Sequence, residues 1–367
     1  MKLLSTNKNK EWHEILNRVD SQDIFYQPEY MTIYEQETHQ APFTHFGGQG
    51  QLFVYGDRNN FIIYPFFKRS ISHLNVTDIH FKDMYDIISP YGFGGPLAQV
   101  NDKSVDQILW EGFYKSFDAY CTENKIISEF CRLHPMFENG RIISKFAPGI
   151  TEKVGQIVYF DLSYSEEKIL SNMIHGHRRK IKSALNNGNL SFETTDLANP
   201  AKCFYELYND NMMRIGANNI YFFSQEFYEA AFHYLKEHLS FWRVSYKGNV
   251  CAGLLVLKYG TQAYAWLSGT RTESLMFHPN NLLIYASCIE LKREGFKYFN
   301  LGGGKTVNGS SIDTLFSFKS GFTKLKKDFY IYKRIHLLPD YERLVLLRPF
   351  QNAENNDFFP KYRLDEL

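Results

Sequence analysis

The sequence predicts an α/β fold with mixed sheets, arranged as two tandem domains of the same kind. The chain has 367 residues, which is more than one ordinary core holds and is typical of two domains. Residues 241–304 read as three strands, a loop, a helix and a glycine-ended strand. The first half of the chain has the same order of elements, although the residues themselves barely match, and this indicates a structural duplication.

The elements expected in the first half follow from hydrophobic spacing and turn residues. Pro28 opens one helix, at a position where its missing N–H costs nothing. Gly, Asp and Asn residues at 56–60 join two strands as a hairpin. The predicted helices are 9–19, 28–37 and 108–120, the strands are 51–55, 61–67, 86–89 and 126–133, and a Gly-rich loop occupies 90–96.

The second half is expected to begin after a loop at 148–155, so that the domains are 1–155, joined by the segment 334–367, and 156–333. Gly188 is a suitable residue to end a long helix that starts at Ser165. The last residues of the chain are expected to form a mobile tail. The predicted helices are 165–187, 200–215, 224–239, one opened by Pro279-Asn280-Asn281, and 339–347, and the strands are 156–162, 241–246, 250–258, 261–268 and 299–304.

Bulk properties exclude several functional classes. The formal net charge is +1, so no overall field favours nucleic acid or an anionic membrane. No apolar run approaches the roughly 20 residues of a transmembrane segment, and the polar N-terminal residues lack a signal-peptide core, so we expect a cytoplasmic protein. The five cysteines are scattered and never form a CxxC pair, which fits reduced thiols in a core.

Gly302-Gly303-Gly304-Lys305-Thr306 suggests a phosphate-binding loop, but the template fails because Phe299 stands where its first glycine belongs. Two interpretations of the three glycines remain open. They can form a turn at a strand end, or they can let a ligand approach bare backbone, as an extended acyl group requires.

A local basic strip is predicted on the helix that contains His175 and His177. The two histidines have metal-like spacing, but no further ligand pair stands nearby, so no metal site is predicted. Arg178, Arg179, Lys180 and Lys182 follow on the same helix and form either a solvated face or a clamp for phosphate groups.

Two further positions are candidates for catalysis. Arg132 and His134 end the last strand of the first domain and share one face of it, where neutral imidazole could accept a proton. Lys319 lies between aromatic residues just after the second Gly-rich strand, where it could offer a positive charge to an oxyanion. Ordinary structural roles remain open for both side chains.

At these residues the chain resembles the Fem family of peptidoglycan interpeptide-bridge aminoacyltransferases and related surface-glycan acyltransferases, which have two tandem GNAT-like domains. The resemblance covers most of the chain, and the order and spacing of its motifs are more specific than any one of them. The motifs are 177–184, Tyr221-Phe222-Phe223-Ser224, Ser268-Gly269-Thr270, 279–283, 299–304 and Phe318-Lys319.

The resemblance implies roles for individual residues. Arg178 matches the arginine for the acceptor's diphosphate, and Lys319 matches the lysine near the acyl donor. His134-Pro135 stands where Fem enzymes tend to carry Asp-Pro, and the long helical arm of some members is missing. The substrate-binding residues expected besides Arg178 are Arg132, Tyr91, Tyr221, Ser268, Asn280, Asn281, Gly302, Gly303 and Gly304.

The resemblance also implies the co-substrates. GNAT enzymes hold the pyrophosphate of coenzyme A at a Gly-rich loop before a helix. Two segments match this loop: 271–278 contains no glycine, and 92–96 has three but lies in the unit that is degenerate in this family. Ordinary coenzyme A binding is therefore weakened and not excluded. We expect no tightly bound cofactor, with acyl-CoA or aminoacyl-tRNA as the donor. The expected partners are a small-molecule, lipid-linked or nucleotide-linked glycan acceptor and, as a second candidate, tRNA.

The function predicted first is transfer of an acyl or aminoacyl group to an amine of a cell-envelope precursor, either a peptide or an amino sugar. His134 is the expected proton acceptor, Lys319 and the glycine N–H groups stabilise the oxyanion, and Arg178 anchors the acceptor with help from Arg132 and Tyr221. Two alternatives stay open. One is an amino-sugar N-acetyltransferase that uses acetyl-CoA, and the other is a non-catalytic binder of glycan or RNA, which the high aromatic content also fits.

Overall fold

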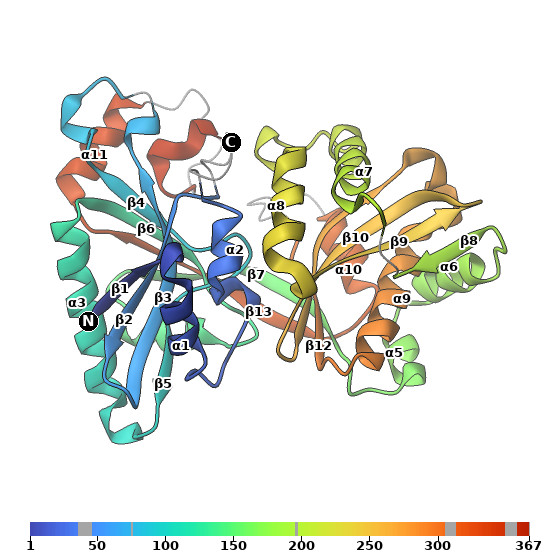
Figure 1. Cartoon of the computed structure of the whole chain (residues 1–367), viewed down its shortest axis with the longest axis horizontal. Coiled ribbons are helices and arrows are strands. Elements are labelled where there is room, and N and C mark those ends of the chain that lie inside the picture. The colour runs from blue at the N-terminus through green and yellow to red at the C-terminus, as the bar shows by residue number, and fades with distance from the viewer. Residues whose placement is uncertain (36–45, 75, 195–196, 305–312, 349–357, 367) are drawn as a thin grey trace. The chain divides into compact units, whose positions relative to one another are not determined.

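The computed structural model describes residues 1–35, 46–74, 76–194, 197–304, 313–348 and 358–366. These residues form two compact units (Figure 1). Unit 1 consists of Met1–Val154 and Phe329–Leu367, and unit 2 of Gly155–Asp328. No helix in the described ranges is both long and apolar enough to cross a membrane.

Unit 1 is built on a mixed sheet with strand order β1-β2-β3-β4-β6-β13, and β5 pairs with β3. β4 and β6 run parallel, and the other pairs are antiparallel. The strands are β1 (Lys2–Ser5), β2 (Gln49–Gly56), β3 (Asn60–Ser70), β4 (Tyr85–Ile88), β5 (Leu97–Val100), β6 (Ile126–Arg132) and β13 (Lys326–Ile335).

Helices cover both faces of this sheet. α3 carries an aromatic stripe, including Phe113 and Phe117, that packs on Phe53 and Phe66 of the strands. α2 approaches the sheet at Gly50, which has no side chain to keep the helix away. The helices of this unit are α1 (Asn9–Leu16), α2 (Pro28–Thr32), α3 (Asp106–Glu123), α4 (Asn139–Phe146) and α11 (Leu338–Leu347).

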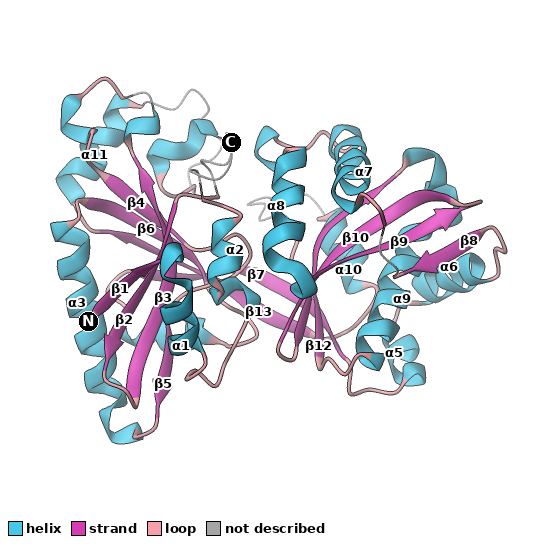
Figure 2. Cartoon of the chain, in the orientation of Figure 1, coloured by secondary structure: helices cyan, strands magenta, loops and turns pink. Residues whose placement is uncertain are grey.

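The strands of unit 2 follow the order β7-β12-β11-β10-β9-β8. β11 and β12 run parallel, and the remaining pairs are antiparallel. Figure 2 shows the strands in magenta and the helices in cyan. The strands are β7 (Ile150–Asp161), β8 (Leu190–Glu193), β9 (Leu239–Tyr246), β10 (Asn249–Tyr259), β11 (Gln262–Thr270) and β12 (Tyr298–Gly302).

The two faces of the unit 2 sheet carry different helices. α6 and α9 pack on the face that contains Phe160, Phe299 and Leu301. α7 crosses the opposite face, where Gly253 and Gly269 leave room for the backbone and side chain of Leu207. The helices are α5 (Glu166–Asn172), α6 (His175–Leu185), α7 (Pro200–Arg214), α8 (Gln225–Leu235), α9 (Pro279–Arg293) and α10 (Thr314–Ser320).

The pairings confirm the predicted duplication. In unit 1, β2, β3 and β4 form an antiparallel series, and α3 then leads to β6, which runs parallel to β4. In unit 2, β9, β10 and β11 form the same series, and α9 leads to β12, which runs parallel to β11. The predicted fold class, two tandem α/β domains of GNAT type with mixed sheets, is therefore correct.

Three details differ from the prediction. The helix expected at 165–187 is two helices, because the backbone is extended at Met173 and Ile174, where the Met173 side chain enters the core and the Ile174 N–H bonds to the carbonyl of Gly321. β7 begins at Ile150, within the segment predicted as a loop. The short elements β1, β5, β8, α4 and α10 were not predicted, since four to eight residues carry little periodic signal, and the longer strand β13 was also not predicted.

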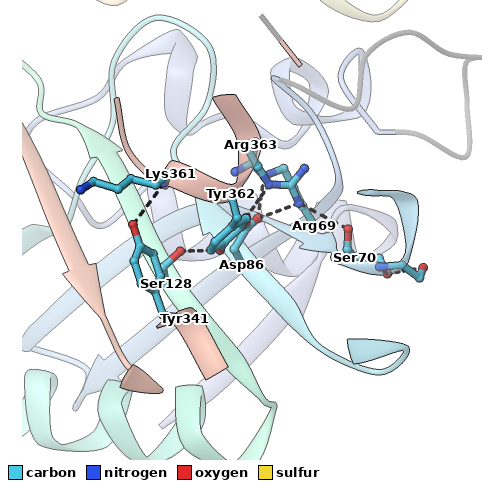
Figure 3. A network of polar contacts seen from close by, with 9 residues as sticks. Arg69, Ser70, Asp86, Ser128, Tyr341, Lys361, Tyr362 and Arg363 are labelled. Carbon is cyan, nitrogen blue, oxygen red and sulfur yellow. Dashed lines mark hydrogen bonds and ion pairs between the residues drawn. The ribbon is translucent and has the colours of Figure 1, made fainter. Parts of the chain in front are cut away.

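The expected mobile tail is also wrong for residues 358–366, which pack into unit 1. Arg363 Nε lies 2.5 Å from Asp86 Oδ2, and Arg69 Nε lies 2.8 Å from Asp86 Oδ1 (Figure 3). Tyr362 donates a 3.1 Å hydrogen bond to the same carboxylate and bonds to Ser128 at 2.6 Å. All five side chains are buried. The terminal segment thus supplies one of the two guanidinium groups that neutralise a buried carboxylate.

We expect Arg363→Ala to lower the free energy of unfolding by about 3–5 kcal/mol, because removal of one partner leaves a buried ionic cluster incompletely compensated. Chemical denaturation followed by circular dichroism measures this change. Arg141→Ala is the control, since Arg141 pairs with Glu138 at the surface and its loss should cost less than about 1 kcal/mol. Equal effects of the two substitutions would contradict the prediction.

Candidate functional site

The central feature of unit 2 is the place where β11 and β12 separate. Their parallel pairing covers three positions and ends at Tyr264 and Asn300. Beyond it, β11 stays paired with β10 as far as Thr270, and β12 stays paired with β7 as far as Gly302. We call this place the fork. In the part of the chain that the structure describes, β11 and β12 are not paired with each other beyond Tyr264 and Asn300.

A glycine turn lies on the β12 side of the fork. Gly302 has a φ of +76°, which favours glycine, and its N–H donates a 2.7 Å hydrogen bond to Asn300 Oδ1. A side chain at Gly304 would collide with the carboxylate of Asp313, which caps α10 by accepting from the N–H of Phe316 at 2.9 Å. The turn and the start of α10 are therefore held together.

α10 brings Lys319 back to this turn. Its ammonium donates a 2.7 Å hydrogen bond to the carbonyl of Gly303, and Nζ lies 3.4 Å from the position of a Cβ on Gly302. Burial lowers the pKa of Lys319 to about 8, an effect that the nearby carboxylate of Asp313 opposes. Lys319 thus lies at the fork, and its role beside an oxyanion stays a prediction.

His177 joins three helices behind the turn. Its Nδ1 contacts the amide of Asn281 at the start of α9, and its ring stacks on Phe322 with centroids 4.3 Å apart. A Cβ on Gly321 would lie 2.1 Å from this ring, so only glycine allows the approach. Burial, followed by the charge of Lys180, lowers the pKa of His177. The side chain holds α6, α9 and α10 together, and the metal interpretation finds no support in the described residues, where no cluster of His, Cys, Asp or Glu could hold an ion.

The basic strip of α6 divides into two parts. Arg178 donates to the carbonyls of Ser171 and Met173 at 3.2 and 3.0 Å, and so closes the end of α5. Arg179 and Lys180 lie near His278, whose pKa is lowered by burial and then by these two cations. Two positive charges therefore lie near the first turn of α9, where the helix dipole is also positive.

The corresponding junction of β4 and β6 in unit 1 is closed by backbone hydrogen bonds. The N–H of Gly94 bonds to the carbonyl of Arg132 at 2.8 Å, and the N–H of His134 bonds back to Gly94 at 3.1 Å. The N–H of Ser89 bonds to Phe130 at 3.0 Å. The Gly-rich loop thus joins the two strands here, where unit 2 leaves them apart.

His134 lies fully buried within unit 1. Its Nδ1 accepts a 3.3 Å hydrogen bond from the N–H of Phe137, and its Nε2 lies 3.4 Å from Asp23 Oδ2. The ring stacks on Phe137 with centroids 4.0 Å apart. Both ring nitrogens of His134 have partners inside unit 1, as is typical of a structural histidine. Its role as proton acceptor stays a prediction.

Arg132 and Tyr91 meet at Phe46 in unit 1. The guanidinium of Arg132 lies 5.9 Å from the centroid of the Phe46 ring, and the ring of Tyr91 lies 4.5 Å from it. In unit 2, Tyr221 and Ser268 are exposed, and Asn280 accepts a hydrogen bond from Thr270. Of the predicted site residues, the structure brings together Lys319 with Gly302 and Gly303, and Arg132 with Tyr91. Asn300 was missed, although a polar residue in an apolar strand before three glycines is a signal for it.

The comparisons with known proteins agree with this architecture. A family model described as an acetyltransferase (GNAT) domain matches residues 171–309. No curated protein sequence matches the chain. The GNAT match covers α6, α9, β11, β12 and the fork, and it ends before α10, which carries Lys319.

Solved structures with the same fold cover nearly the whole chain. FemX has a TM-score of 0.67 at 12% identity, over 94% of this chain and 99% of FemX. The C-terminal domain of a putative lysylphosphatidylglycerol synthetase from Agrobacterium fabrum has a TM-score of 0.54 at 13% identity, over 93% and 98%. A conserved protein of unknown function from Bacteroides thetaiotaomicron has 0.56 at 9% identity, over 90% and 97%. The expected resemblance to Fem-like tandem GNAT proteins is confirmed at the level of the fold, and the family model supports the coarser functional prediction, a GNAT-type N-acyltransferase.

We expect Gly321→Ala to destabilise the protein by about 1–3 kcal/mol, because the new methyl group meets the ring of His177. Gly176→Ala is the matched control in α6, where a Cβ meets nothing within 4 Å and should stabilise the helix by about 0.5–1 kcal/mol. Thermal or chemical unfolding measures both changes. The prediction fails if the two variants shift stability in the same direction.

Proposed function

We propose that this chain transfers an acyl or aminoacyl group from an activated ester or thioester to an amine on a cell-envelope precursor. The observation that carries the proposal is the ammonium of Lys319 at the glycine turn, 2.7 Å from the carbonyl of Gly303, at the point where β11 and β12 separate. The GNAT match over this region and the Fem-like fold support it.

The chemistry follows from the groups at the fork. A neutral amine attacks the carbonyl carbon of the donor, a C–N bond forms, and the C–S or C–O bond of the donor breaks with departure of the thiol or hydroxyl group. The proton of the amine is lost to a base. His134, the base predicted from the sequence, belongs to unit 1 and not to the fork, and its role stays a prediction. Lys319 and N–H groups near Gly302–Gly304 stabilise the negative oxygen of the tetrahedral intermediate, an effect of about 3–4 kcal/mol per donor.

In this proposal, cations on α6 bind the phosphate groups of a substrate. Arg178 is the arginine that the Fem resemblance assigns to the acceptor, with Arg132 and Tyr221 as helpers. Because Arg178 already bonds two carbonyls of α5, Arg179 and Lys180 near the first turn of α9 are the stronger candidates for a diphosphate. A nucleotide-linked or lipid-linked glycan, coenzyme A and the end of tRNA all carry such groups.

A second candidate stays within the same reaction class. The family model is described as an acetyltransferase domain, which favours an amino-sugar N-acetyltransferase with acetyl-CoA as donor. The lysylphosphatidylglycerol synthetase domain carries the same fold, and its name favours an aminoacyl group instead.

The proposal is tested by mass spectrometry of the purified protein with acyl-CoA or charged tRNA pools and nucleotide-sugar or peptidoglycan-precursor acceptors. We expect one new amide product, formed from one of the two donor classes. Lys319→Ala should lower kcat/KM by roughly 100- to 1,000-fold with little change in stability. Binding of acceptors without any product from either donor class would favour the non-catalytic alternative.

The pKa of Lys319 predicts the pH dependence of turnover. The ammonium is present below about pH 8 and is lost as the pH rises through this value, so turnover should fall above about pH 8. Lys319→Arg keeps a charge at all these pH values and should lack the alkaline decline, although its maximal rate will be lower. A decline at the same pH in both proteins would assign the titration to another group.

A further inference from the structure

The side chain of Asn300 has a hydrogen-bonding group that no described residue uses. Asn300 is 1% exposed, and its Oδ1 accepts from the N–H of Gly302 at 2.7 Å. Because the N–H of Gly302 must face an oxygen, this bond identifies the near atom of the Asn300 amide as Oδ1, and Nδ2 points the other way. No described residue accepts a hydrogen bond from this buried Nδ2. An unpaired buried donor costs about 1–3 kcal/mol, so its retention needs a reason.

The position of Asn300 supplies the reason. Asn300 forms the last parallel pair with Tyr264, immediately before the strands separate. Its neighbours Phe299 and Leu301 point into the core on the α9 side, so strand alternation places Asn300 on the opposite face. The register against β7 is irregular between Asn300 and Gly302, and the Asn300 side chain bonds the N–H of Gly302. The unpaired donor therefore belongs to the side chain that fixes the glycine turn, and Lys319 bonds the carbonyl of Gly303 in the same turn.

We infer that Asn300 Nδ2 donates a hydrogen bond to the carbonyl oxygen of the bound acyl donor, so that Asn300 both fixes the glycine turn and recognises the acyl group. This inference rests on the proposed function and adds a residue to it. A neutral amide donor complements the ammonium of Lys319, because it bonds the uncharged carbonyl before attack and the negative oxygen after it. No bond to Asn300 is made or broken in this role.

Two substitutions separate the roles of the side chain. Asn300→Asp keeps an oxygen for the N–H of Gly302 and removes the second donor, whereas Asn300→Ala removes both. The probes are acetyl-CoA and coenzyme A, which differ by the acyl group with its carbonyl, with binding measured by isothermal titration calorimetry. We expect the wild-type protein to bind acetyl-CoA about 3- to 10-fold more tightly than coenzyme A, and both variants to lose this preference.

The aminoacyl alternative has an equivalent pair of probes. A stable amide-linked 3′-aminoacyl adenosine and adenosine replace the coenzyme A pair, and the same loss of preference is expected. Asn139→Asp is the matched control, since Asn139 is a buried asparagine of unit 1 whose Nδ2 donates to the carbonyl of Gly94 at 2.9 Å. It should lower stability while the preference for the acylated probe persists.

The outcomes distinguish a failure of the inference about Asn300 from a failure of the proposed acyl-transfer function. If the wild-type protein prefers an acylated probe and both Asn300 variants keep that preference, the inference is wrong and the proposed function stands. If the wild-type protein binds neither pair of probes, both fail. Loss of the preference in Asn300→Ala alone would reduce Asn300 to a support for the glycine turn and would also overturn the inference.

Discussion

The parallel pairing of β11 with β12 covers only three positions, and the arrangement of unit 2 depends on this constraint. β11 is paired with β10, and β12 with β7, along their lengths, while β11 and β12 separate from each other beyond those three positions. β12 ends in a turn that the positive φ of Gly302 makes possible. That turn directs the carbonyl of Gly303 toward α10, and Lys319 is held by it.

The two units share one topology but differ at the junction of their parallel strands, which backbone hydrogen bonds bridge in unit 1 only, among the described residues. In unit 1 the residues after β4 bond back to β6 through Gly94, and the buried pair of His134 and Asp23 fills the region beside them. In unit 2 the residues after β11 form a short turn that ends at His278, a residue with a left-handed backbone. The junction of the parallel strands is thus bridged by backbone hydrogen bonds in the first unit, whereas in the second unit Lys319 and the glycine turn lie beside it.

Much of the fold could be predicted from the sequence, because the order of helices and strands alone indicates the duplication, even where the residues do not match. The sequence also pointed to Lys319 as a residue near the glycine turn, because it follows the second Gly-rich strand and lies between aromatic residues. The break at Met173 was not, because it depends on a hydrogen bond from Ile174 to Gly321, nearly 150 positions away in the chain. Asn300 and His177 acquire their roles in the same way, through partners that adjoin them only after the sheet and the helices have assembled.

The division of unit 1 into two stretches of chain has a consequence for biosynthesis. Unit 2 is continuous, so the ribosome completes it while the final strand and helix of unit 1 are still absent. Asp86 and Arg69 are made early, yet Arg363 reaches them only after some 280 further residues have been added. During translation the first unit therefore stays incomplete until the residues around Arg363 have been added.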